Sequence, residues 1–228
     1  MLRTIKVCVI ILGLIGGSLS AVVPSDVEAT LDKFLNIITS YDNFKMEFQI
    51  TAQLAGINAN ADGVLLYDKS GKFRLELGQL LYLINDGNNI WFYTPLFKEY
   101  SRSDSNIQQI AQLFSPSATS PTLGPALSFF LKQIFQSQDF ALQSAFMREE
   151  NLENKKSLVL TFTSAKGFEV KIWLEPKNYD LQQIGVMAKI GEGQKIIIYL
   201  KVLKFSTNIS LPSNAFLFVP PPGAKLKD

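Results

Sequence analysis

Nothing narrows the possible folds of this chain more than the one-by-one alternation of apolar and charged residues in several separate stretches. In FKMEFQI, residues 44–50, and KFRLEL, residues 72–77, every second side chain is apolar and most of the others are charged. Successive side chains of a strand point to opposite faces, so the pattern predicts strands with one apolar and one wet face. Turn signals at Lys69-Ser70-Gly71 and Asp86-Gly87 separate such stretches. The first half of the chain is therefore predicted to be a meander of about six strands.

Strand patterns return in the second half. They cover residues 157–164, 168–176, 180–190 and 194–205, and the connections between them are short. Short connections favour antiparallel pairing of neighbouring strands. The chain shows no internal repeat and no linker long enough to separate domains, so we expect one domain over residues 21–228.

Two regions have the spacing of helices. SDVE at residues 25–28 fits a capping box with Ser25 as the N-cap, followed by an apolar stripe that ends near Ser40. Residues 105–114 suggest a short helix capped by Asp104, and a second helix is predicted to begin at Pro125 after a loop of small residues and prolines. We interpret this pair as a lid. The expected fold is α+β but mainly β: a single, strongly curved antiparallel sheet, covered by helices over a hydrophobic cavity.

Residues 1–20 have the plan of a secretory signal peptide. Arg3 and Lys6 precede an apolar stretch from Val7 to Gly17, and Ser18-Leu19-Ser20 offers a small-x-small cleavage site. An uncleaved anchor is the alternative. Without this leader 20 basic and 20 acidic residues remain, so net charge gives no argument for a nucleic-acid partner or for an anionic membrane. The one cysteine, Cys8, also lies in the leader.

The chain contains no histidine, and this absence limits its chemistry. Serine–histidine triads, histidine metal clusters and histidine acid–base catalysis are excluded. A pair of catalytic carboxylates could be imagined at Glu149 and Glu150, or at Glu169 and Glu175, but their positions are those of a solvated face. We therefore expect a protein that is not an enzyme and that uses neither a metal nor another cofactor.

The stretch NDGNNIWFYTP, residues 85–95, places four large residues in succession after a turn. Preceded by LLYLI at residues 80–84, it resembles the DG-x-x-L-W-F-Y-x-P signature of LolA-type periplasmic carriers of outer-membrane lipoproteins. AFLFVPPPGAK, residues 215–225, resembles the closing F-x-F-x-PP-x-G pattern of the same family.

The resemblance implies an unclosed half-barrel of about eleven strands with a helical lid. It implies a carrier that receives the acyl chains of lipoproteins from an inner-membrane lipoprotein-releasing transporter and passes them to an outer-membrane acceptor, without a cofactor. We expect a monomer in the periplasm. The alternatives are a lipid-binding or glycolipid-binding protein of this fold, or a regulatory protein that senses lipoprotein.

Candidate site residues follow from the apolar face and the resemblance. Where the family has Lys-Arg-Pro this chain has Asp68-Lys69-Ser70, so Lys69 is the residue expected to hold the lid closed. Whether Trp91 or Phe92 points inward is left open, because a period of two permits either face. The predicted lipid-binding cavity consists of Leu31, Phe34, Phe44, Met46, Phe48, Phe73, Leu75, Leu83, Trp91, Phe92, Leu127, Phe129, Phe130 and Ile134.

Overall fold

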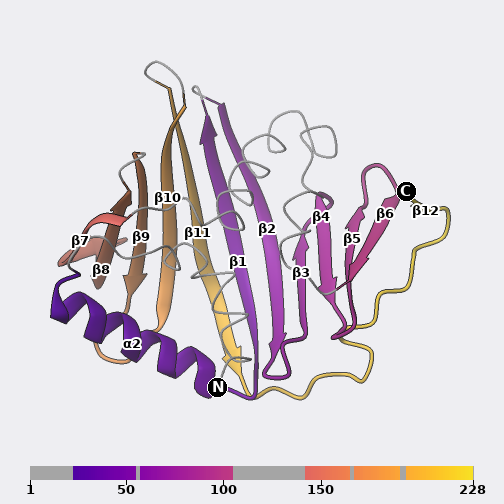
Figure 1. The fold of residues 1–228 in the computed structure, drawn as a ribbon, viewed down its shortest axis with the longest axis horizontal. Helices are drawn as coiled ribbons and strands as arrows, with labels where there is room; N and C mark the ends of the chain where they lie inside the picture. The colour runs from indigo at the N-terminus through magenta and orange to yellow at the C-terminus, as the bar shows by residue number, and fades with distance from the viewer. Residues whose placement is uncertain (1–22, 55–56, 105–141, 165–166, 191–193, 228) are drawn as a thin grey trace.

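One open, curved sheet of twelve strands makes up most of the protein (Figure 1). The computed structural model describes residues 23–54, 57–104, 142–164, 167–190 and 194–227. The order of strands across the sheet is β12-β6-β5-β4-β3-β2-β1-β11-β10-β9-β8-β7. Their bounds are β1 Asn43–Leu54, β2 Ile57–Asp68, β3 Phe73–Leu77, β4 Leu81–Asn85, β5 Asn89–Thr94, β6 Glu99–Asp104, β7 Leu142–Leu152, β8 Lys155–Ser164, β9 Phe168–Leu174, β10 Leu181–Ile190, β11 Gln194–Thr207 and β12 Lys225–Leu226.

The order of strands follows from the two series of hairpins. β1 to β6 form the first series and β7 to β11 the second, and the sheet becomes continuous where β1 pairs antiparallel with β11. All neighbours are antiparallel except β12, which pairs in parallel with β6. The predicted meander of six strands is confirmed. Gly71 and Gly87, in the predicted turns, have φ of 90° and 100°, a conformation that L side chains rarely adopt.

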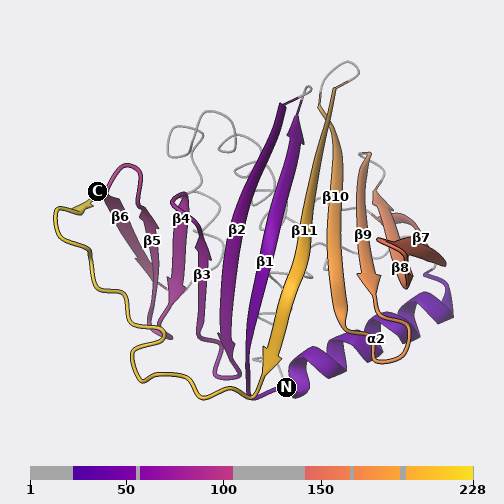
Figure 2. The ribbon, with the colours of Figure 1, turned by 180° about the vertical axis from the view of Figure 1, so that it is seen from behind.

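A single helix, α2 (Ser25–Ser40), is present among the described residues, and it lies across one end of the sheet (Figures 1 and 2). Val27, Thr30, Phe34 and Ile38 form its buried side. The hydroxyl of Thr30 lies 3.4 Å from the sulfur of Met147 in β7. We call the sheet face that packs with α2 the inner face, and the opposite face the outer face.

The predicted capping box does not form. The helix begins at Ser25 itself, so that Pro24 occupies the N-cap position and no side chain caps the helix. Instead the backbone carbonyl of Pro24 accepts a hydrogen bond from the amide of Glu28, at 3.1 Å. Ser25 is therefore the first helical residue. From that position its hydroxyl does not accept the backbone hydrogen bond that the side chain of an N-cap residue accepts.

The strand β7 was not predicted, because SAFMREE has no clear alternation with a period of two. The helices predicted for residues 105–114 and from Pro125 onward lie outside the described residues, so a helical lid over the sheet is not shown. The sheet has twelve strands where the resemblance implied about eleven.

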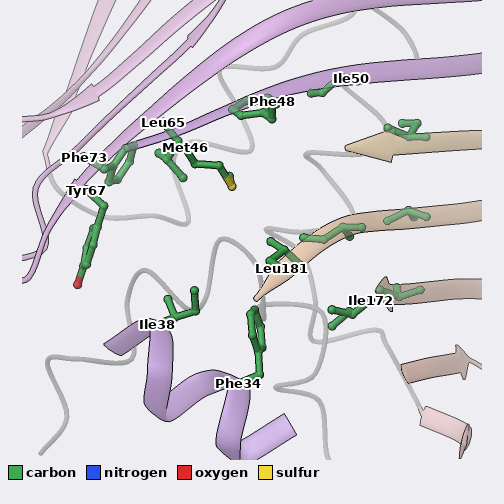
Figure 3. Close-up of a cluster of buried hydrophobic side chains, with 14 of the residues drawn as sticks. Phe34, Ile38, Met46, Phe48, Ile50, Leu65, Tyr67, Phe73, Ile172 and Leu181 are labelled. Atoms are coloured by element: carbon green, nitrogen blue, oxygen red, sulfur yellow. The ribbon is translucent and has the colours of Figure 1, made fainter. Parts of the chain in front are cut away.

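Apolar side chains of the inner face form the main core. Figure 3 shows Phe34 of α2 directed toward Leu181 of β10 and Ile38 directed toward the sheet, with Met46, Phe48 and Ile50 of β1 beyond them. The alternation predicted for β1 is confirmed: Phe44, Met46, Phe48 and Ile50 are buried, and the residues between them are not.

Candidate functional site

Most of the predicted cavity residues meet on the inner face. Seven are nearly fully buried in a single cluster and two others are partly buried against it. They come from α2 and from four strands, although they are up to 61 positions apart in the chain. The buried ones are Phe34, Phe44, Met46, Phe48, Phe73, Leu83 and Phe92, and the partly buried ones are Leu31 and Leu75. The remaining candidates Leu127, Phe129, Phe130 and Ile134 lie outside the described residues.

The second series of strands extends the same surface, and the predicted cavity omitted it. The inward-facing side chains of β8 to β11 belong to the same cluster. Their strands had been predicted, so the same alternation would have found them. They include Leu160, Phe162, Val170, Ile172, Ile184, Val186, Ile196 and Ile198.

A glycine on the inner face makes room for one aromatic ring. Gly63 of β2 pairs with Phe48 of β1 and with Leu77 of β3. A Cβ atom at Gly63 would lie 2.4 Å from the Cε2 and Cζ atoms of Phe48, and 2.9 Å from Cδ2 of Leu77. The ring of Phe48 therefore lies over the backbone of Gly63, where no other residue would fit without displacing it.

Trp91 does not belong to this surface, because β5 divides its side chains between the two faces. Ile90 and Phe92 are in the inner cluster, whereas Trp91 and Tyr93 are on the outer face with Ile84 and Phe218. The prediction that Trp91 lines the same cavity as Phe92 is thus corrected. Both faces of β5 are apolar because both are covered: the outer one packs beneath the C-terminal segment.

Phe218 is the residue that covers the outer face of β5. Its ring centroid lies 5.2 Å from that of Trp91, 5.9 Å from Tyr93 and 5.6 Å from Tyr100. The segment that carries Phe218 leaves the sheet at Asn208, whose side-chain Oδ1 accepts a hydrogen bond from the amide of Asp42 at 3.0 Å. The two family-like motifs, 125 positions apart at Tyr93 and Phe218, therefore form one aromatic cluster.

Asp86 holds the turn that precedes this strand. Its Oδ2 accepts a hydrogen bond from the indole N–H of Trp91 at 2.8 Å, and its Oδ1 accepts bonds from the amides of Asn88 and Asn89, each at 2.8 Å. Burial by itself raises the pKa of Asp86, but these hydrogen bonds to the carboxylate outweigh it, and the pKa lies below its ordinary value. The aspartate and tryptophan of the motif thus act together in stabilising the turn.

Lys69 is engaged away from the inner cluster. Its ammonium group forms an ion pair with Asp42, and its amide donates to the Asp42 carbonyl at 2.8 Å. The hydrogen bond from Lys69 to the Asp42 carboxylate raises the pKa of the lysine. Both side chains are about two-thirds exposed, so this pair ties the β2–β3 turn to the residue before β1 at the surface. The part of the chain that would form the predicted lid is not described, and the role of Lys69 in closure stays a prediction.

The outer face carries a hollow of about 510 Å³ near the middle of the sheet. Glu47, Asp62 and Glu76 contribute to its lining, but Glu47 pairs with Lys45 at 2.7 Å and Glu76 with Arg74 at 2.5 Å. The hydrogen bond from Lys45 lowers the pKa of Glu47. Within the described ranges, no group of three or more acidic residues is placed to hold a metal ion, and no helix is long and apolar enough to cross a membrane.

The inner face is thus suited to apolar contact. Among the described residues, no charged side chain is buried. A surface of this kind offers dispersion contacts and exclusion from water.

Comparisons with known proteins give a family and a shared fold. The family model described as "Predicted periplasmic protein (DUF2092)" matches residues 68–226. A curated relative, uncharacterized protein MJ0687 from Methanocaldococcus jannaschii, is 24% identical over 177 residues, which are 78% of this chain and 46% of the relative. The chain therefore spans about half the length of that relative.

Among solved structures, an uncharacterized conserved protein from Thermus thermophilus is 12% identical with a TM-score of 0.55, and the match covers 89% of this chain and 98% of that one. This likeness shows a common fold. LolA superfamily protein NE2245 from Nitrosomonas europaea is 13% identical with a TM-score of 0.39, covering 86% and 98% of the two chains.

Proposed function

The chain belongs to the family of predicted periplasmic proteins (DUF2092) whose model matches residues 68–226, and from this premise we propose that it is a non-enzymatic periplasmic carrier of acyl chains. On this proposal the acyl chains of a lipoprotein bind to the inner face and travel from an inner-membrane transporter toward an outer-membrane acceptor. The observation that carries the proposal is the continuous apolar inner face, which extends over strands of both series and α2. The sequence motifs at residues 85–95 and 215–225 support the choice of lipoprotein as cargo.

Binding on this face requires displacement of protein atoms. Phe48, Phe73 and Leu83 are each only 1–2% exposed, so a ligand reaches them only when the groups that now shield them move aside. Burying an acyl chain of about 16 carbons contributes roughly 12 kcal/mol at ~0.8 kcal/mol per methylene, before association costs. Two or three chains together would exceed the practical limit of about 20 kcal/mol for non-covalent binding. Competition from the protein's own apolar contacts lowers this affinity and makes release feasible.

Native mass spectrometry of protein purified from the periplasm of an expressing bacterium tests the proposal. Bound lipoprotein, or its acylated fragment, is the expected result. Phospholipid alone would favour the lipid-binding or sensing alternative. An empty protein that also fails to take up a fluorescent fatty acid would contradict any lipid carrier.

The two faces of β5 provide a matched pair of variants. Phe92 and Tyr93 are neighbours of similar size, 5% and 6% exposed, but Phe92 lies on the inner face and Tyr93 on the outer. Phe92→Ala and Tyr93→Ala should therefore destabilise the fold comparably, by about 3–5 kcal/mol for Phe92→Ala. Only Phe92→Ala should change the affinity for the acyl probe. Equal effects of the two substitutions on binding would argue against the inner face as the site.

A further inference from the structure

Exposed apolar side chains gather along one margin of the sheet. The described residues include seven large apolar side chains with high exposure, and five of them lie in the β5–β6 turn or the C-terminal segment. The other two, Phe146 in β7 and Leu203 in β11, lie elsewhere on the sheet. The five are 44–68% exposed and comprise Leu96, Phe97, Leu217, Val219 and Leu226. Exposed apolar surface that is concentrated in this way marks a site of interaction.

Three of these side chains, Leu96, Phe97 and Leu226, come from two segments that lie side by side at one corner of the molecule. β12 pairs with β6 in a register that places Lys225 beside Glu99 and Leu226 beside Tyr100. Glu99 begins β6 directly after the turn that carries Leu96 and Phe97. Figure 1 shows β12 and the end of the chain beside β6 at this end of the sheet. We call residues 95–98 and 225–227 the corner.

Backbone hydrogen bonds hold the corner in this form. Within the turn, the amide of Phe97 donates to the carbonyl of Thr94 at 3.1 Å. Between the two segments, the amide of Lys225 donates to the carbonyl of Lys98 at 2.8 Å and the amide of Lys227 donates to that of Tyr100 at 2.7 Å. Leu96 and Phe97 thus project from a hydrogen-bonded turn, and they remain in water although strand β5 before them is largely covered.

Lysines surround these apolar side chains. Lys98, Lys225 and Lys227 are all exposed. Among the described residues of the corner and of the β6 positions that pair with β12, the one acidic residue is Glu99. Its carboxylate lies 3.7 Å from the ammonium group of Lys227. Among the described residues of the corner, three lysines thus lie beside a single glutamate, although basic and acidic residues balance over the chain without the leader. Projecting apolar side chains with lysines around them have the chemistry of a bilayer interface: the apolar groups enter the acyl region while the ammonium groups remain at the lipid phosphates.

We propose that this corner docks the protein onto the surface of an anionic membrane. Leu96, Phe97 and Leu226 enter the interface, and Lys98, Lys225 and Lys227 contact the lipid phosphates. This goes beyond the proposed carriage of acyl chains, because it assigns a lipid bilayer as partner to a surface outside the inner cluster. It requires no bound cargo.

Co-sedimentation of the periplasmically purified protein with vesicles tests the proposal. One set of vesicles contains phosphatidylethanolamine and phosphatidylglycerol, and the other contains phosphatidylcholine alone. Wild-type protein should bind the anionic set more tightly, and added salt should weaken this binding. The double variant Leu96→Ala/Phe97→Ala should bind at least tenfold more weakly. Each of Lys98→Gln, Lys225→Gln and Lys227→Gln should reduce binding to the anionic set by about fivefold.

Matched controls come from exposed residues elsewhere. Phe146→Ala and Leu203→Ala remove comparable apolar surface, and Lys177→Gln removes an exposed charge in the β9–β10 turn. All three should bind vesicles like the wild type. Circular dichroism of each variant checks that the fold is retained, as expected for substitutions of exposed side chains.

Four results would overturn the proposal. The first is failure of the wild type to bind anionic vesicles, and the second is binding by Leu96→Ala/Phe97→Ala as tight as that of the wild type. The third is a loss of vesicle binding in the control variants equal to that in the corner variants. The fourth is a wild-type dimer in sedimentation that the double variant converts to a monomer. The last result would identify the corner as an interface between copies of the chain. Because docking through the corner needs no cargo on the inner face, its failure would leave the proposed acyl carriage standing, and failure to find cargo would not affect vesicle binding.

Discussion

Replacing Gly63 with alanine should destabilise the protein, because the inner face has no space for the added methyl group. Its carbon would lie 2.4 Å from two ring atoms of Phe48, far inside the 3.5–4.0 Å at which carbon atoms make favourable contact. Phe48 is 1% exposed, so its ring cannot turn into solvent. We expect a loss of about 1–3 kcal/mol, the usual cost of overpacking a core.

A second substitution separates this clash from other effects of alanine. Phe48→Ala alone should cost about 3–5 kcal/mol, through lost burial and the cavity it leaves. In the double variant Gly63→Ala/Phe48→Ala the new methyl group enters part of that cavity, and the clash is absent. The double variant should therefore lose less stability than the sum of the single losses, by about 1–3 kcal/mol.

Urea denaturation of the wild type, the two single variants and the double variant measures this coupling. The midpoints should shift while the slope of unfolding free energy against urea stays constant. In thermal unfolding each kcal/mol should shift Tm by about 2–4 °C for a chain of this size. Strict additivity, or a Gly63→Ala variant as stable as the wild type, would refute the assignment of Gly63 as space for the Phe48 ring.

Three other predictions concern the outer face and the surface. The lowered pKa of Asp86 means that folding favours its charged form, so its contribution to stability should be present above about pH 4 and disappear as pH falls through the folded-state pKa. In Asp86→Asn the free energy of unfolding should therefore depend less on pH in that range. Identical pH dependence of the variant and the wild type would contradict this account. Phe218→Ala should cost about 3–5 kcal/mol and shift the fluorescence of Trp91 to the red, whereas exposed Val219→Ala should change stability by less than about 0.5 kcal/mol. Lys69→Met should change Tm very little, because Lys69 pairs with Asp42 in water; faster loss of an acyl probe from this variant would support the predicted role of Lys69 in lid closure, and unchanged retention would contradict it.

Alternation along single strands predicted much of the inner face. Phe44, Met46 and Phe48 were identified because strand geometry sends every second side chain to the same side, whatever the rest of the fold. The same rule identifies the strands of the second series, whose inner residues belong to the same cluster. It does not identify β7, an edge strand where exposed Phe146 interrupts the alternation.

The composition of the chain does not show how its charges are distributed over the folded surface. The numbers of basic and acidic residues balance once the leader is set aside, which gave no sign of a membrane partner. Lys98 and Lys227 are 129 positions apart, and they reach the same corner only because β12 pairs with β6. Net charge adds all residues together, whereas an interface responds to the few charges within a Debye length.

From the order of its residues alone, this chain dictates an antiparallel sheet with one apolar face, because that consequence depends only on neighbours along each strand. The orientation of residues 90–93 could not be deduced in the same way. A period of two assigns Trp91 and Tyr93 to one face and Ile90 and Phe92 to the other, but it does not say which face is which. That depends on the folded molecule, in which Phe218 covers Trp91 and Tyr93 while Phe92 joins the inner cluster. The physical reason is that burial of a strand's second face requires a partner, and here the partner comes from a segment more than 120 positions away.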